Sequence, residues 1–189
     1  MTTSRRSTNE PIYQLKVTLR GIRPPIWRRL QVSSDTTLYK LHQIIQIAMG
    51  WENYHLYEFE SGETRFGEPD PDWGMDIKSS RRAKLSQVVK GEKTKFSYTY
   101  DMGDNWEHEV VVEKILMPEL AQRYPVCVTG KRACPPEDCG GIWGYEELLE
   151  IMSDPTHEEY EERMEWLGPG FKPESFNVEQ VNLALKRIR

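Results

Sequence analysis

The stretch that decides the fold is YTYDMGDNWEHEV, residues 98–110, in which two alternating runs flank a short polar segment. Tyr98 and Tyr100 share one face of the first run, and Trp106 and His108 share one face of the second. The intervening DMGDN consists mostly of residues that tolerate positive φ or cap their own backbone. The pattern therefore predicts an antiparallel hairpin whose turn carries two carboxylates.

Upstream of this hairpin, the sequence predicts three further strands, the third with a short partner, and one helix. Apolar residues alternate with polar ones over 13–19 and 26–32, which is typical of half-buried strands. Over 38–48 they recur every three or four residues, after a Ser/Thr-rich segment that offers N-cap oxygens and before a glycine. A further strand is expected over 55–60, paired with residues 64–66. The N-terminal two-thirds thus indicates a sheet with a helix packed on it.

After residue 66 the pattern changes from strands to helices, apart from the hairpin over 98–110. Residues 67–82 form a long Pro/Gly/Asp segment that we expect to be an exposed loop, followed by a short helical turn over 85–89. Apolar stripes over 145–152, 154–167 and 177–188 predict a mainly helical C-terminal third. Strands early and helices late favour an α+β fold, with an antiparallel or mixed sheet packed against helices, over a repeating βαβ fold.

Composition limits the classes of protein that fit. The chain has 189 residues with 25 basic and 30 acidic side chains, for a net charge of −5. We expect a disordered polar tail over residues 1–11 and a single domain over 12–189. The acidic balance disfavours a nucleic-acid partner, while a protein partner stays open. Because the sequence shows neither a secretory h-region nor a long apolar run, we expect a cytoplasmic protein with no membrane partner.

One candidate pocket combines imidazoles and carboxylates. His42 and His55 fall on or beside faces predicted to point inward, and the hairpin contributes Asp101, Asp104 and His108. Hard oxygens with borderline nitrogens could ligate a divalent cation or supply a general base. The alternative is that the aspartates cap the turn and each histidine is a separate hydrogen-bonded core residue. Both interpretations are open at this point.

A second candidate cluster lies in ACPPEDCGGIWGYEE, with Cys134, Glu137, Asp138 and Cys139. These residues, with His157, could ligate zinc, but the sequence lacks the second cysteine pair of a zinc knuckle. The simpler interpretation is an acidic turn whose glycines allow a close backbone approach before a helix. We therefore expect no cofactor, with a divalent metal as the open alternative.

Several motifs follow one another in an order that resembles a known family. They are IRPPIWRRLQV, TLYKLHQIIQIAMGW, HLYEF, YTYDMGDNWEHEV, CPPEDCGGIWGYEELLE and EWLG, and together they resemble the plasmid pRiA4b ORF-3-like family over residues 11–189. The resemblance implies one α+β domain, sometimes associated with mobile elements, and no established activity. The candidate residues named above, except Cys139 and His157, fall on positions that match the family's signature.

Two functional hypotheses follow. The first is a non-enzymatic binding or accessory protein in which the motif residues are mostly architectural. The second is a metal-dependent hydrolytic or nucleic-acid-processing enzyme that uses the first pocket, with Glu137 or Asp138 in support. The sequence contains no nucleophile elbow, phosphate-binding glycine loop or His-Glu-x-x-His helix that would favour another chemistry.

Overall fold

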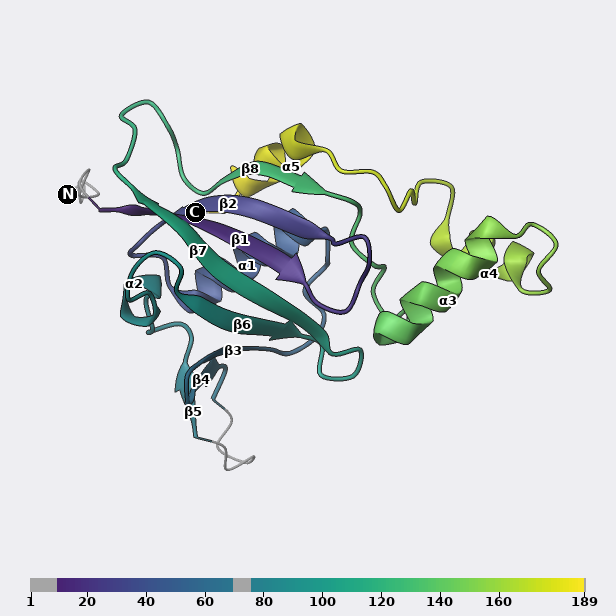
Figure 1. The fold of residues 1–189 in the computed structure, drawn as a ribbon, viewed down its shortest axis with the longest axis horizontal. Coiled ribbons are helices and arrows are strands. Elements are labelled where there is room, and N and C mark those ends of the chain that lie inside the picture. The colour runs from purple at the N-terminus through teal and green to yellow at the C-terminus, as the bar shows by residue number, and fades with distance from the viewer. Residues whose placement is uncertain (1–9, 70–75, 189) are drawn as a thin grey trace.

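The computed structural model describes residues 10–69 and 76–188, and in these residues the chain forms one eight-stranded sheet with helices (Figure 1). The strand order is β5-β4-β3-β6-β7-β1-β2-β8. The strands are β1 Ile12–Leu19, β2 Trp27–Ser33, β3 Tyr57–Ser61, β4 Thr64–Gly67, β5 Ile77–Ser79, β6 Lys95–Tyr100, β7 Trp106–Leu116 and β8 Val126–Lys131. The helices are α1 Leu38–Met49, α2 Leu85–Val88, α3 Gly141–Ser153, α4 Tyr160–Leu167 and α5 Val178–Leu185. The predicted α+β class is confirmed.

The predicted hairpin forms the middle of the sheet. Tyr98 on β6 lies opposite His108 on β7, and Tyr100 lies opposite Trp106. All four side chains are buried because they alternate with outward-facing residues on two antiparallel strands. Strand β7 pairs on its other edge with β1, so the hairpin is held from both sides.

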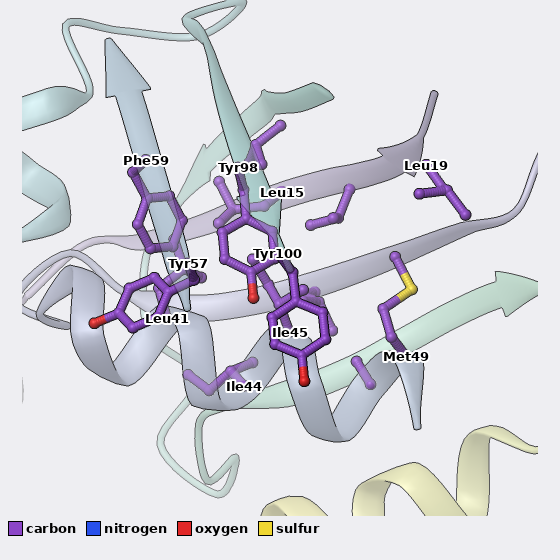
Figure 2. Close-up of a cluster of buried hydrophobic side chains, with 14 of the residues drawn as sticks. Leu15, Leu19, Leu41, Ile44, Ile45, Met49, Tyr57, Phe59, Tyr98 and Tyr100 are labelled. Atoms are coloured by element: carbon purple, nitrogen blue, oxygen red, sulfur yellow. The ribbon is translucent and has the colours of Figure 1, made fainter. Parts of the chain in front are cut away.

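Helix α1 covers one face of this sheet. Thr37 caps its first turn by accepting a hydrogen bond from the Lys40 N–H, and Gly50 ends it in the left-handed region at φ 102°. Its apolar stripe, which includes Leu41 and Ile45, packs against Tyr98 and the neighbouring rings (Figure 2). This packing fixes where the chain leaves α1 and enters the segment that precedes β3.

Two strands lie where the sequence predicted none. Strand β5 falls within the predicted loop 67–82 and pairs in parallel with β4, while residues 70–75 of that loop lie outside the described residues. Strand β8 pairs with β2 inside a part of the chain expected to be helical. Both are short edge strands, so neither carries enough alternation to stand out from loop sequence.

The helical C-terminal third also differs in detail. The helix expected from residue 154 begins at Tyr160, after a turn in which Asp154 caps the Thr156 N–H. Helix α5 lies against β8, whereas α3 and α4 lie beyond the β6–β7 turn (Figure 1). The predicted tail falls mostly on residues 1–9, which lie outside the described residues. Its last residue, Pro11, accepts a hydrogen bond from the Ser34 N–H.

Candidate metal centre

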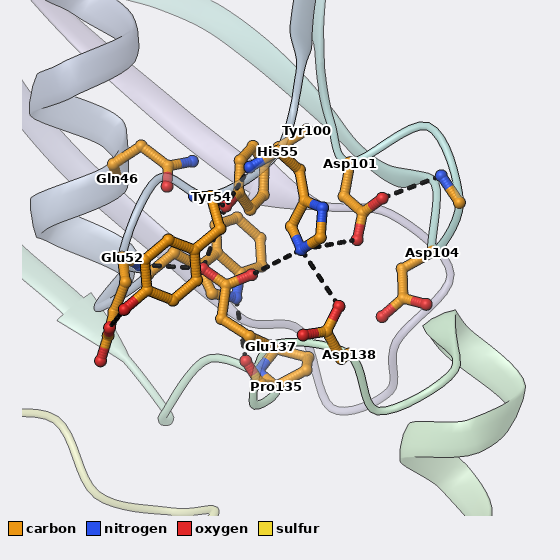
Figure 3. A network of polar contacts seen from close by, with 12 residues as sticks. Gln46, Glu52, Tyr54, His55, Tyr100, Asp101, Asp104, Pro135, Glu137 and Asp138 are labelled. Atoms are coloured by element: carbon orange, nitrogen blue, oxygen red, sulfur yellow. Dashed lines mark hydrogen bonds and ion pairs between the residues drawn. The ribbon is translucent and has the colours of Figure 1, made fainter.

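Three segments far apart in the sequence meet beside the β6–β7 turn (Figure 3). The segment between α1 and β3 contributes His55, the turn contributes Asp101, and the loop before α3 contributes Glu137 and Asp138. The His55 Nε2 atom lies 3.1 Å from Asp138 Oδ1, 3.6 Å from Asp101 Oδ2 and 4.0 Å from Glu137 Oε2. We call these four residues the acidic histidine site.

Asp101 is held so that one of its oxygens faces His55. Its backbone is left-handed at φ 57°, a conformation that Asp adopts more readily than most residues. Its N–H donates to the Leu56 carbonyl at 2.9 Å, and its Oδ1 accepts from the Gly103 N–H at 2.8 Å. Because Oδ1 is occupied by the turn, Oδ2 of this buried carboxylate is left to face the imidazole.

Glu137 is oriented in a similar way by Tyr100. The tyrosine hydroxyl donates to Glu137 Oε1 at 3.0 Å and accepts from the Tyr54 N–H at 3.0 Å, while the Glu52 N–H also donates to Oε1 at 2.9 Å. Burial, together with this hydrogen bond to Glu137, raises the pKa of Tyr100 above its ordinary value, so the hydroxyl stays protonated. Oxygen Oε2 of Glu137 is enclosed and has no hydrogen-bond partner among the described residues.

The loop that carries Asp138 is seated directly on the hairpin turn. A Cβ built on Gly141, which has φ 68°, would lie 2.6 Å from the Asp104 carbonyl oxygen. The Gly140 N–H donates to Asp104 Oδ2 at 3.3 Å. Asp104 therefore holds the loop in place through these contacts with Gly140 and Gly141. Asp138 is in the same loop, with a left-handed backbone at φ 55°, and its carboxylate lies toward His55.

The spacing of these atoms suits a small divalent cation. In a tetrahedral zinc site with bonds of about 2.1 Å, neighbouring ligand atoms lie about 3.4 Å apart. The donor atoms of His55, Asp101 and Asp138 all lie within 4.8 Å of one another, so small side-chain movements would bring them to bonding distance. One imidazole with several carboxylates is a ligand set for Zn²⁺, Mn²⁺ or Fe²⁺.

The other two histidines of the predicted pocket lie in the core, on a separate polar network. His42 stacks on Tyr57 at 3.6 Å and bonds to the Tyr98 hydroxyl through Nδ1 and to Asn53 Oδ1 through Nε2. Because Asn53 Oδ1 can only accept, Nε2 of His42 donates and Nδ1 accepts from Tyr98. His108 donates from Nδ1 to the Tyr98 carbonyl at 3.2 Å. Burial lowers the pKa of each imidazole to about 4, so both are neutral near pH 7.

The structure thus divides both predicted clusters. It brings together His55 and Asp101 from the first and Glu137 and Asp138 from the second, with Asp104 directly behind them. Cys134 and Cys139 do not belong to the described group of donor atoms that could share an ion. Burial raises the pKa of both thiols, that of Cys139 to about 12, so they are protonated near neutral pH.

Among the residues that hold the site, sequence reasoning missed Tyr100, which orients Glu137, and Glu52, whose N–H bonds to it. Tyr100 was identified as an inward-facing residue of the hairpin and a position that matches the family's signature, but not as a residue of the site. A tyrosine at the end of a strand, next to a turn rich in aspartate, is a signal for such a role, because its hydroxyl reaches past the core. Its partner could not be identified without the tertiary structure.

Comparison with known proteins identifies the family and agrees with the α+β fold. The family model described as "Plasmid pRiA4b ORF-3-like protein" matches residues 11–180, and the chain belongs to this family. The uncharacterised protein y4hQ of Sinorhizobium fredii is 40% identical over 176 residues, which cover 92% of this chain and 90% of that protein.

A solved structure also matches. It is the crystal structure of MM3350, a protein of unknown function from Methanosarcina mazei Go1, with a TM-score of 0.83 and 44% identity. The match covers 90% of this chain and 96% of that one. These relatives establish the fold and the family, and their names state no activity. Within the described residues, no helix has the length and apolar character needed to cross a membrane.

Proposed function

We propose that this protein binds a divalent transition-metal ion at the acidic histidine site. His55 Nε2, Asp101 Oδ2 and Asp138 Oδ1 would be the ligands, with Glu137 Oε2 close enough to join them or to bind a metal-bound water. The observation that carries the proposal is a pair of enclosed atoms, His55 Nε2 and Glu137 Oε2, that make no hydrogen bond in the described structure and have only ion-pair contacts at 3.1–4.0 Å. Both face the same point as the two aspartate carboxylates (Figure 3).

Electrostatics support a cation at this point. In the described part of the chain, the ion pairs of Asp101, Glu137 and Asp138 run to His55 alone. Three carboxylates around one imidazole repel one another, and partial burial weakens the screening by water. A bound dication would offset this repulsion and supply the missing partner of the enclosed oxygen.

The proposal is tested by titrating Mn²⁺ and Zn²⁺ into chelator-treated protein in a calorimeter. We expect about one ion per chain, and we expect His55→Ala and Asp138→Asn each to weaken binding by about 10- to 100-fold. His157→Ala is the matched control, because His157 is exposed in the α3–α4 connection and caps the Glu159 N–H. Circular dichroism of each variant would check that the fold is retained.

Equal affinity of wild type and a folded His55→Ala variant would contradict the proposal. So would the absence of binding by the wild type at millimolar metal concentrations. Loss of binding in the His157→Ala control would show that the ion sits elsewhere.

A second candidate function, metal-dependent hydrolysis, is favoured by one observation. The Asp138 side chain is 68% exposed, so the site opens to solvent, as a catalytic metal with a free coordination position requires. Glu137 Oε2 would then be the general base. Glu137→Gln preserves the oxygen that accepts from Tyr100, so it should keep the metal and lower any hydrolysis of p-nitrophenyl acetate or p-nitrophenyl phosphate by about 100-fold. No hydrolysis by metal-loaded wild type would leave binding as the function.

A nucleic-acid substrate remains disfavoured under this proposal. Glu52 and Asp104 add further carboxylates around the site, and the whole chain has a net charge of −5. Phosphates of a nucleic acid would be repelled by such a surface. The proposed role is therefore a metal-binding accessory protein. The sequence predicted an accessory protein of the cytoplasm without a cofactor, with a divalent metal as the open alternative.

A further inference from the structure

A separate groove of about 520 Å³ lies between the C-terminal end of α1, the loop over residues 133–137 and helix α5. This volume falls in the range of small-molecule sites, which are mainly apolar with a few polar groups. Apolar and aromatic side chains account for much of its lining, among them Trp51, Trp166, Phe171, Phe176 and Val181. The groove is not part of the acidic histidine site, although Glu137 contributes to the walls of both.

Arg28 lines this groove and is a buried cation without an acidic partner. Only 1% of its surface is exposed, and among the described residues no carboxylate lies within ion-pairing distance of its guanidinium. Its Nε donates to the Ala48 carbonyl at 2.6 Å, and its Nη1 donates to the carbonyls of Trp27 and Lys131 at 2.9 and 3.0 Å. Burial lowers the pKa of Arg28 from its ordinary value, as expected when a charge leaves water.

The remaining nitrogen, Nη2, takes part in none of the hydrogen bonds described for Arg28, which leaves its N–H donors for a ligand in the groove that Arg28 lines. The three hydrogen bonds use Nε and Nη1, and the Phe176 ring covers one face of the guanidinium at 4.2 Å. A guanidinium has five N–H donors, and two of them are on Nη2. Backbone carbonyls near the end of α1 offset part of the charge, but a full negative charge would offset the rest.

We propose that the groove binds an amphipathic monocarboxylate, with its carboxylate on Arg28 Nη2 and its hydrocarbon body against Phe171 and Val181. A single available guanidinium nitrogen suits one singly charged oxyanion. A doubly charged phosphate would be repelled by Glu137 in the same wall. Arg28, Phe171 and Val181 are not ligands of the proposed ion, so decanoate binding does not require the metal, although Glu137 borders both sites.

The test uses decanoate as the probe, with decanol and decyl phosphate as comparisons, each below its micelle concentration. Calorimetry should show about one decanoate bound per chain, and tryptophan fluorescence should change because Trp51 and Trp166 line the groove. Removal of the charge in decanol should weaken binding on the order of tenfold, and decyl phosphate should bind more weakly than decanoate.

The location is tested with matched variants. Arg28→Met should weaken decanoate binding on the order of tenfold. Arg29→Met should leave it unchanged, because Arg29 is on the opposite face of β2 and pairs with Glu113. Since Arg28→Met removes structural hydrogen bonds, Ala184→Phe provides a second test by filling the groove while Arg28 remains. It should abolish binding with an unchanged circular dichroism spectrum.

Three results would overturn the inference. They are the absence of decanoate binding to wild type, equal binding of decanol and decanoate, and undiminished binding by folded Ala184→Phe. Stronger binding of decyl phosphate would also overturn the choice of a monocarboxylate.

Discussion

The three inward-facing imidazoles of this protein have different partners, and the partners set their chemistry. His42 and His108 are surrounded by tyrosine and tryptophan rings and are neutral. His55 faces three carboxylates and keeps an enclosed nitrogen without a hydrogen bond. At the scale of single residues, His55 is therefore the one of the three suited to hold a cation, while the other two stabilise the core.

Gly141→Ala tests how the carboxylate of Asp138 is held in place. The new Cβ would meet the Asp104 carbonyl, so we expect a loss of about 1–3 kcal/mol in the free energy of unfolding and weaker metal binding. Gly62→Ala is the control, because Gly62 has a similar φ of 60° but nothing within 4 Å of the added Cβ. Denaturant unfolding of both variants measures these losses. Equal losses of unfolding free energy in the two variants would contradict a role for the close contact between Gly141 and Asp104.

The sequence supplied the right residue types for the site but not their grouping. One of the two open interpretations placed His55 and Asp101 in a pocket with His42 and His108, whereas their neighbours are Glu137 and Asp138. Alternation along a strand places a side chain on a face, but it does not say which distant loop covers that face. The approach of the loop to the turn depends on the contact between Gly141 and Asp104, some 37 residues apart in the sequence.

At the scale of elements, the long periodic segments were predictable and the short edge strands were not. Helix α1 and the β6–β7 hairpin have regular apolar patterns and recognisable caps or turn residues, and they form where expected. Strands β5 and β8 exist because a neighbouring strand offers hydrogen bonds. These hydrogen bonds become available only when the sheet assembles, so the sequence of a short edge strand does not predict them.

One side chain of α5 hydrogen-bonds the helix to the edge of the sheet. Asn182 accepts from the Cys127 N–H at 2.8 Å and donates to the Cys127 carbonyl at 2.9 Å, so it occupies backbone groups of the edge strand β8. We expect Asn182→Ala to lower the free energy of unfolding by about 1–3 kcal/mol. Leu183→Ala, at a neighbouring position that is 61% exposed, should change it by less than about 0.5 kcal/mol. Equal effects of the two changes in urea unfolding would contradict this account.

At the scale of the whole molecule, stability should fall as the pH drops below the ordinary histidine range. The pKa values of His42 and His108 are about 4 in the folded protein, against 6.5 for the free side chain. Between these values the unfolded chain binds protons that the folded one does not, so acid favours unfolding. Each histidine should remove roughly 2 kcal/mol from the free energy of unfolding between about pH 7 and pH 5.

The contribution of one histidine can be isolated by substitution. His108→Phe keeps a ring beside Trp51 and Tyr98 but has no proton to gain. On going from about pH 7 to pH 5, the wild type should therefore lose roughly 2 kcal/mol more of its free energy of unfolding than the variant does. A difference that does not change with pH would show that His108 is not kept neutral by burial.

The central claim is that three segments far apart in the sequence place one imidazole and several carboxylates around a single bound cation. Anomalous diffraction from crystals grown with Mn²⁺ tests it most directly. We predict a peak within about 2.0–2.4 Å of His55 Nε2, Asp101 Oδ2 and Asp138 Oδ1. A map with manganese peaks elsewhere and none between these atoms would contradict the assignment.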